Sequence, residues 1–479
     1  MPESRTMIRW GVAIALAIFA CAWAAHDVAL NNYDTAYALL WGRDIVGGHL
    51  PDYGVGLAPT PHPLATLFGA LLALPGRGDV PASDGAVWVW MTFAYLSLLA
   101  LGALVFALGR QWFGTAAGVL AAVIVLTREP ILSYGLRAYV DIPYICLLLA
   151  ALLLESRRPR AGTPVLVLLA LAGLLRPEAW FFALLYGAWL WRGGALKPHQ
   201  VALVVSAPVL WALSDLAIAG NPLYSLTGTR EGARELGRQT GLAKLVELTP
   251  RRLGEILREP VLLACAGGLA FSIWRLPRRV APGGVAVVAA LAAFAVLAAA
   301  GLSIITRYLL PAATLLAIFA AGGVFGWLQL NRDDSARRPW AIFGAVAALA
   351  LLLFIPMQAK KLDRLDAALD RQGAILTELR GFFSAGAVLS PVCEPITLPN
   401  RRAVPQVSLW TGLRPGKEVF SGIDDGVRGA YIAPADAQVA KDFVLDRSDL
   451  DKRLPAAPAG AQREFAYWRV HLPDNPACH

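Results

Sequence analysis

Long runs of apolar residues, separated by short polar turns, follow one another along most of this chain. Runs of this kind predict helices that cross a membrane rather than strands of a soluble sheet. Several runs are shorter than the ~20 residues that a straight span needs, so we expect tilt, kinks or partial burial to help them. We predict about eleven spans, at Trp10–Ala25, Val87–Leu108, Gly114–Thr127, Val140–Leu154, Pro164–Leu175, Ala179–Trp191, Val201–Ala219, Val261–Trp274, Val285–Leu302, Tyr308–Leu328 and Trp340–Phe354.

The composition agrees with that class. Hydrophobic residues make up 57% of the chain and charged residues 16%, and the mean hydropathy is +0.54. These values exclude an ordinary soluble domain. Because many apolar runs follow the first one, Trp10–Ala25 is interpreted as a spanning helix and not as a cleaved signal peptide.

The basic residues fall in alternate turns between the runs, which orients the chain. With a cytoplasmic N-terminus, the cytoplasmic turns contain Arg5, Arg9, Arg110, Arg157, Arg158, Arg160, Arg192, Lys197, Arg275, Arg278, Arg279, Arg332, Arg337 and Arg338. The positive-inside rule expects this bias, and it predicts a multi-pass protein of the cell inner or plasma membrane. The same turns account for most of the net charge of +9, so no nucleic-acid partner is expected.

The chain is expected to form two domains, a transmembrane domain at 1–356 with long external loops (26–86 and 220–259) and a small extracytoplasmic α/β domain at 357–479. The second domain should open with an amphipathic helix, whose leucines recur at spacings of three and four residues. Strand-like runs follow at Ala387–Ser390, Ala430–Ala433 and Phe465–His471, between turns rich in Pro and Gly. The expected fold class is therefore mainly α, a polytopic membrane helix bundle with a small C-terminal α/β domain.

The five cysteines divide by their position. Cys21, Cys146 and Cys265 fall inside predicted spans, where a thiol usually acts as a small apolar filler. Cys393 and Cys478 fall in the predicted external domain, where an oxidising environment allows a disulfide between them. No Cys-x-x-Cys or His-rich spacing indicates zinc.

Asp34 follows the first apolar run by a few residues, where the chain is expected to leave the bilayer. We predict that it lies on an interfacial helix, off a face formed by Tyr33, Tyr37, Leu40, Trp41 and Ile45. One interpretation is that a carboxylate near a helix N-terminus only favours the helix dipole, worth about 0.3–1 kcal/mol. The other is a catalyst, because ionisable groups at membrane depth are costly and usually have a task.

The rest of the first external loop is aromatic and broken by prolines, with His62 in the segment Pro59-Thr60-Pro61-His62-Pro63. A loop of this length is longer than a connector needs to be, so we expect it to cover a site. The next external turn contains Arg137 and Tyr139 and ends in Asp141, which is followed by Pro143 at a predicted helix start. Asp141 therefore has the same two interpretations as Asp34.

Two arginines lie at other external edges of the predicted spans. Arg176 belongs to Leu174-Leu175-Arg176-Pro177-Glu178-Ala179-Trp180, and Arg307 to Thr306-Arg307-Tyr308-Leu309-Leu310-Pro311. Each side chain can reach lipid headgroups or bind a phosphate through paired, charge-assisted hydrogen bonds. Arg307 is the better phosphate candidate, because it stands directly at the end of an apolar run.

The order of these segments resembles the GT-C superfamily over roughly residues 8 to 355. The similar segments are the acidic first loop, Asp141 before Ile-Pro-Tyr, Leu-Arg-Pro-Glu-Ala-Trp, Gly220-Asn221-Pro222-Leu223-Tyr224-Ser225 and Arg307-Tyr308-Leu309-Leu310-Pro311. The superfamily comprises multi-span glycosyltransferases that use polyprenyl-phosphate sugars, among them protein O-mannosyltransferases and lipid A aminoarabinose transferases.

The resemblance implies an inverting sugar transfer to a glycan, lipid or protein acceptor. Asp34 would be the general base and Arg307, then Arg176, would stabilise the leaving phosphate. Asp141 would orient the acceptor, hold a divalent cation or position an arginine. The implied substrate-binding residues are Tyr37, His62, Arg137, Tyr139, Glu178, Tyr224 and Tyr308. Asp34 lacks the second nearby acid of many members, so Mg²⁺ or Mn²⁺ at Asp34 and Asp141 stays an open expectation.

Two other classes of function remain open at this point. A transporter or flippase of a lipid-linked glycan precursor would also have charged helix ends, and it predicts inverted repeats with broken helices. A non-catalytic cell-envelope assembly protein would act through its C-terminal domain. This last class predicts that Asp34→Asn leaves function intact.

Overall fold

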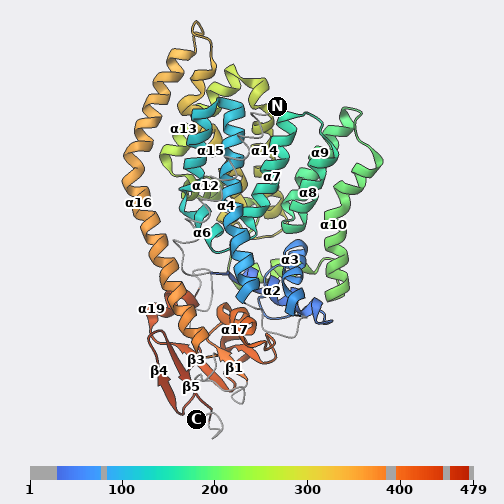
Figure 1. Ribbon diagram of the computed structural model, residues 1–479, viewed down its shortest axis with the longest axis vertical. Coiled ribbons are helices and arrows are strands. Elements are labelled where there is room, and N and C mark those ends of the chain that lie inside the picture. Colours follow the sequence, from blue (N-terminus) through green and yellow to red (C-terminus); the bar gives the residue numbers. More distant parts are fainter. Residues whose placement is uncertain (1–29, 77–83, 384–394, 446–453, 474–479) are drawn as a thin grey trace. The chain divides into compact units, whose positions relative to one another are not determined.

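The computed structural model describes residues 30–76, 84–383, 395–445 and 454–473 (Figure 1). The chain divides into two compact units, each assembled from separate segments. Unit 1 comprises Met1–Asp27, Thr92–Trp211 and Gln239–Leu365, and unit 2 comprises Val28–Met91, Ala212–Arg238 and Asp366–His479. The division into 1–356 and 357–479 stays a prediction, since both units draw on three parts of the chain.

All regular secondary structure among the described residues of unit 1 is helical. The helices that belong wholly or mostly to unit 1 are α4 (Asp84–Phe113), α5 (Thr115–Leu126), α6 (Glu129–Leu136), α7 (Asp141–Arg157), α8 (Thr163–Leu175), α9 (Glu178–Arg192), α10 (Pro198–Ala219), α12 (Leu242–Leu257), α13 (Glu259–Arg275), α14 (Pro277–Ala299), η2 (Thr306–Leu309), α15 (Leu310–Phe325), η3 (Gly326–Gln329) and α16 (Arg337–Gly381). Every predicted span beyond the first is helical, whereas Trp10–Ala25 lies outside the described residues.

Five of the described helices are long and apolar enough to cross a membrane, or up to seven if each of two bent pairs is one span. The bent pairs are α5 with α6, at 65°, and α12 with α13, at 107°. Helices α7, α8 and α9 are shorter, as their short apolar runs predict. The chain is therefore a polytopic membrane protein.

The central helix of unit 1, α15, is buried from end to end because its neighbours approach it closely. A Cβ atom on Gly268 of α13 would lie 1.9 Å from the Phe319 carbonyl oxygen, and one on Gly323 of α15 would lie 2.1 Å from the Ala264 carbonyl oxygen. Ala264 and Gly268, four apart on α13, together with Gly323 on α15 thus let the two backbones meet, as small residues commonly do between membrane helices.

Helix α16 joins the last predicted span to the amphipathic helix that follows it. A span at Trp340–Phe354 and a separate amphipathic helix after Met357 are predicted, but one continuous 45-residue helix contains both, with Pro356 inside it. Proline removes one backbone donor, and that loss does not end this helix. The leucines that form the apolar face of the predicted amphipathic helix are Leu362, Leu365, Leu369, Leu376 and Leu379, and all of them except Leu362 are buried.

Unit 2 combines the first loop with the C-terminal residues. Its elements are α2 (Tyr33–Val46), α3 (Pro63–Ala73), η1 (Leu74–Gly76), α11 (Tyr224–Glu235), β1 (Ile396–Leu398), η5 (Arg401–Ala403), α17 (Val404–Thr411), β2 (Val419–Ser421), α18 (Gly422–Asp425), β3 (Ala430–Pro434), α19 (Ala437–Val439), the π-helix η6 (Ala440–Val444), β4 (Gln462–Glu464) and β5 (Trp468–His471), with the end of α16.

The five strands form one mixed sheet in the order β2-β1-β3-β5-β4. Strands β2, β1 and β3 are parallel, whereas β5 pairs antiparallel with both β3 and β4. The sheet buries its apolar residues against α17 and the end of α16 (Figure 1). The predicted strands at Ala430–Ala433 and Phe465–His471 are found as β3 and β5. The run Ala387–Ser390 lies outside the described residues, as do Cys393 and Cys478.

Helix α2 is the helix that the sequence predicts around Asp34, but its exposure differs from the prediction. It is buried from Thr35 to Arg43, while Ile45 is exposed. The reason is that α3 and α17 both pack against it. Arg43 donates to the Ser408 carbonyl oxygen (3.4 Å), and a Cβ atom on Gly69 of α3 would lie 2.3 Å from the Ala38 carbonyl oxygen.

Candidate active site

Arg176 stands in the break between α8 and α9, and the sequence explains that break. The residue before a proline is pushed toward extended backbone, and Arg176 has φ −148° and ψ 128°. Pro177 lacks an N–H and so cannot continue α8, whereas it precedes the first turn of α9 without cost. The side chain of Arg176 is thereby held at the ends of two helices.

The Arg176 guanidinium meets two carboxylates. Its Nη2 donates to Asp141 Oδ1 at 2.6 Å, and its Nε lies 3.7 Å from Glu178 Oε1. The three side chains are at most 6% exposed, and Asp141 and Glu178 lie in the first turns of α7 and α9. Burying an unpaired charge is costly, so each member makes the others' burial tolerable.

The same group brings in Arg307 and Tyr308 from η2. The Arg176 Cζ atom lies 4.7 Å from the centre of the Tyr308 ring, and the Arg307 Cζ atom lies 5.7 Å from it. Arg307 Cζ is also 6.0 Å from the ring of Tyr139. Two guanidiniums therefore share one aromatic ring, within the range of cation–π attraction.

Several polar atoms in this arginine cluster (Asp141, Arg176, Glu178, Arg307 and Tyr308) are buried without a hydrogen-bond partner in the described structure. They are Asp141 Oδ2, Glu178 Oε2 and Arg176 Nε. Native proteins rarely leave such atoms unsatisfied, and where they do so a ligand or water is a common reason. The cluster thus has unused hydrogen-bonding capacity around two cations.

The turn between α6 and α7 contains two further predicted site residues, Arg137 and Tyr139. Arg137 donates to the Ser133 hydroxyl, and Tyr139 packs edge-on against Tyr134 with ring centres 4.9 Å apart. Ala138 between them has φ +56°, a left-handed conformation that turns the chain sharply into α7. This turn brings Tyr139 toward Arg307.

Asp34 lies in unit 2, in the first turn of α2. The helix does not need it as a cap, because the Asn32 side chain accepts the hydrogen bond from the Thr35 N–H at 3.0 Å. The helix-dipole interpretation of Asp34 stays open, because the dipole favours a carboxylate in the first turn whether or not it caps the helix.

A ladder of aromatic rings runs from the start of α2 to α11. Successive ring centres are 4.7 to 6.0 Å apart in the series Tyr33, Tyr37, Trp41, Tyr53 and Tyr224. The Tyr224 hydroxyl donates to the Tyr53 carbonyl oxygen at 2.5 Å. Tyr224 thus holds the first loop in place, and His62 is buried at the N-terminus of α3.

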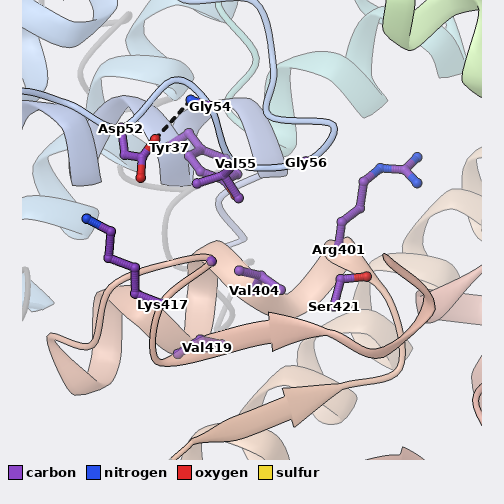
Figure 2. A pocket seen from close by; sticks show the side chains of 11 residues that line it. Tyr37, Asp52, Gly54, Val55, Gly56, Arg401, Val404, Lys417, Val419 and Ser421 are labelled. Carbon is purple, nitrogen blue, oxygen red and sulfur yellow. Dashed lines mark hydrogen bonds between the residues drawn. The ribbon is translucent and has the colours of Figure 1, made fainter. Parts of the chain in front are cut away.

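A pocket of about 180 Å³ opens next to Tyr37 (Figure 2). It is lined by Tyr37, Asp52, Gly54, Val55, Gly56, Arg401, Val404, Gly416, Lys417, Val419 and Ser421. Of the predicted site residues only Tyr37 lines it. Arg401 and Lys417 were missed because they stand in a domain without a catalytic motif, and the Arg401-Arg402 pair after Asn400 was the available signal.

No group of three or more His, Cys, Asp or Glu residues that could hold a metal ion occurs among the residues that the structure describes. Asp141 forms an ion pair with Arg176, and its role in the reaction stays a prediction.

Known structures share this fold, although no protein-family model and no curated sequence matches the chain. ArnT from Cupriavidus metallidurans bound to undecaprenyl phosphate is 12% identical with a TM-score of 0.51, and its apo state is 13% identical with a TM-score of 0.52. Both comparisons cover 98% of each chain. AglB from Archaeoglobus fulgidus, in complex with an inhibitory peptide and a dolichol-phosphate, is 12% identical over 90% of this chain and 70% of its own, with a TM-score of 0.48. The two ArnT structures thus have the same overall fold as this chain.

Proposed function

We propose that this protein is a membrane glycosyltransferase that moves a sugar from a polyprenyl-phosphate donor to an acceptor hydroxyl on the outer face of the membrane. The observation that carries the proposal is the arginine cluster, in which Arg176 and Arg307 flank Tyr308 at the ends of membrane helices. The ArnT structure with the same fold is bound to undecaprenyl phosphate, which is a lipid monophosphate of the proposed kind.

The leaving group of such a transfer is the lipid phosphate, whose oxygen gains charge as the bond to the sugar breaks. Arg307 is the main candidate to stabilise that charge, because Arg176 is already held by Asp141. A preorganised cation in a site from which water is excluded acts more strongly than the same cation in water. In this proposal Asp141 is a positioning residue that fixes Arg176, and Glu178 supports it at the longer distance of 3.7 Å.

The nucleophile is an acceptor hydroxyl, which must lose its proton as it attacks the anomeric carbon. Asp34 is the proposed general base and takes that proton. One bond forms between the acceptor oxygen and the anomeric carbon while the bond to the phosphate oxygen breaks, so a single displacement inverts the anomeric centre. Tyr37, His62, Arg137, Tyr139, Tyr224 and Tyr308 are the proposed substrate-binding or site-shaping side chains.

The proposed setting is the cell inner or plasma membrane, with a cytoplasmic N-terminus and the C-terminal sheet outside. The acceptor is a glycan, a lipid or a protein. In this proposal a divalent cation at Asp34 or Asp141 has one role only, which is to assist the binding of the phosphate. The sugar transferred is a hexose or a pentose.

A transporter or flippase of a lipid-linked precursor is the second candidate, because the structure contains broken helices. The bent pairs α5–α6 and α12–α13 are the kind of interruption that transporters place at a binding site. Both breaks end at an arginine, Arg128 and Arg258, whose charge suits an anionic headgroup.

One experiment separates the two candidates. Purified protein in liposomes is given undecaprenyl-phosphate-linked sugars on the outer face, together with candidate acceptors, and free undecaprenyl phosphate is measured by mass spectrometry. A transferase releases it in proportion to glycosylated acceptor. A flippase moves the intact donor to the other leaflet with no release, and that result contradicts the proposal.

A further inference from the structure

We propose that the pocket beside Tyr37 in unit 2 binds an oxyanion, a phosphate or carboxylate group carried by the acceptor sugar. The pocket lies wholly within unit 2, between the Asp52–Gly56 segment of the first loop and the α17–β2 segment of the C-terminal sheet domain (Figure 2). The inference rests on the proposed function in one respect, since it takes the acceptor as the carrier of the anion.

Two hydroxyls of the pocket lining are almost fully buried. Tyr37 is 1% exposed and its hydroxyl interacts with that of Tyr33, whereas Ser421 is 7% exposed and its Oγ has no hydrogen-bond partner in the described structure. A buried hydroxyl left unpaired costs roughly 1–3 kcal/mol. The Ser421 hydroxyl therefore favours a ligand that accepts a hydrogen bond from it.

The Tyr37 hydroxyl is a donor at neutral pH. Burial raises its pKa well above the usual value, and the neighbouring Tyr33 adds to that rise, whereas Arg401 opposes it. The proton therefore stays on the oxygen, and the Tyr37 side chain is neutral. Because Arg401 acts on the pKa of both Tyr33 and Tyr37, its guanidinium lies within electrostatic reach of this end of the pocket.

The charges that line the pocket favour an anion. Arg401 and Lys417 are on opposite sides of it, and Asp52 is the one carboxylate in the lining (Figure 2). Asp52 Oδ1 accepts a hydrogen bond from the Gly54 N–H at 2.9 Å and so helps to shape the loop. A guanidinium on one side of the pocket and an ammonium on the other suit the negative charge of a phosphate or a carboxylate.

The size of the pocket limits the ligand. Its volume of about 180 Å³ is below the roughly 300–1,000 Å³ of sites that enclose a drug-sized molecule. An anionic group with part of the sugar that carries it fits this space. A lipid chain or a whole oligosaccharide would have to extend beyond it.

The location connects the pocket to the proposed chemistry. Tyr37 lies three residues after Asp34 on α2, and a helix rises about 1.5 Å per residue, so the two positions are roughly 4.5 Å apart along the axis. An anion bound at Tyr37 would therefore hold the acceptor sugar within reach of Asp34. The pocket is thus proposed as a positioning site for the acceptor.

Binding is tested by isothermal titration calorimetry on the full-length protein in nanodiscs, without a donor, so that turnover plays no part. The probes are N-acetylglucosamine 1-phosphate, glucuronic acid and neutral N-acetylglucosamine. The variant is Arg401→Gln with Lys417→Gln, and the matched control is Arg463→Gln with Lys441→Gln, both exposed and outside the pocket. Tyr37→Phe and Ser421→Ala each remove one donor while keeping the charge.

The inference predicts that at least one anionic sugar binds. The Arg401→Gln/Lys417→Gln variant should raise its dissociation constant at least tenfold, whereas the Arg463→Gln/Lys441→Gln control should leave it unchanged. Tyr37→Phe is expected to weaken it about three- to tenfold. The probe that binds identifies the anion as phosphate or carboxylate. Equal binding of the neutral sugar, no binding of either anionic sugar, or an equal loss in the control variant overturns the inference. The calorimetry tests only the pocket, whereas the release of undecaprenyl phosphate tests only the proposed function. Either proposal can therefore be contradicted without the other.

Discussion

Asp141 and Arg176 show how a single ion pair makes a polar site possible at the ends of membrane helices. Both side chains are almost fully buried, and the 2.6 Å hydrogen bond lets each neutralise the other. Removing one partner leaves a buried charge without compensation, which typically costs 3–5 kcal/mol. The pair is therefore expected to be indispensable for the local structure even before any substrate binds.

We expect Asp141→Asn to destabilise the protein more than Glu178→Gln does. Asp141 makes the close hydrogen bond to Arg176, whereas Glu178 Oε1 stays 3.7 Å from it. The cost for Asp141→Asn should approach the ~3 kcal/mol of a broken buried pair, and that for Glu178→Gln should be smaller. Thermal unfolding of the purified variants in one detergent measures the order, and an equal or reversed order contradicts the assigned roles.

Arg307→Gln is expected to lower kcat/KM for the donor about 10²–10³-fold with little change in stability. Removing one donor to a developing negative charge has an effect of this size in other enzymes. The exposed Arg338, at the start of α16, offers Arg338→Gln as the control. A loss in Arg307→Gln no greater than in the control would rule Arg307 out as the phosphate ligand.

At the scale of elements, the approach of α13 to α15 depends on glycine. We expect Gly268→Ala to lower the unfolding temperature markedly, because the added methyl group would lie 1.9 Å from the Phe319 carbonyl oxygen. Overpacking of this kind typically costs 1–3 kcal/mol. Gly284→Ala on α14 is the control, since nothing lies within 4 Å of its added Cβ. Equal unfolding temperatures of Gly268→Ala and Gly284→Ala would show that α13 and α15 can move apart without a loss of stability.

Helices and strands were predictable from the sequence where the pattern of residues within the element itself determines its structure. The apolar runs located the described spans, and Pro177 and Asp141 marked helix ends correctly. The packing of α2 was not predictable, because the partners that bury Arg43 are α3 and α17, and α17 is more than 350 residues away along the chain. The pocket at Tyr37 and Arg401 was not predictable for the same reason, because its lining residues are far apart along the chain.

At the scale of the whole molecule, the arginine cluster belongs to unit 1, and Asp34 with the Tyr37 pocket belongs to unit 2. The proposal assigns the phosphate ligands to unit 1 and the general base to unit 2. Each unit has its own compact core, so a variant in one unit is expected to leave the fold of the other intact.

The central claim is that Asp34 is the general base, and the matched pair Asp34→Asn and Asp44→Asn tests it most directly. Both residues lie on α2, and Asp44 forms an ion pair with Arg43 at 3.6 Å, away from the start of the helix. The measurement is the rate of undecaprenyl phosphate release, with unchanged thermal unfolding as the check on folding. The account predicts a loss of about 10²–10⁴-fold in Asp34→Asn and near wild-type release in Asp44→Asn. Normal release in a folded Asp34→Asn variant would contradict it.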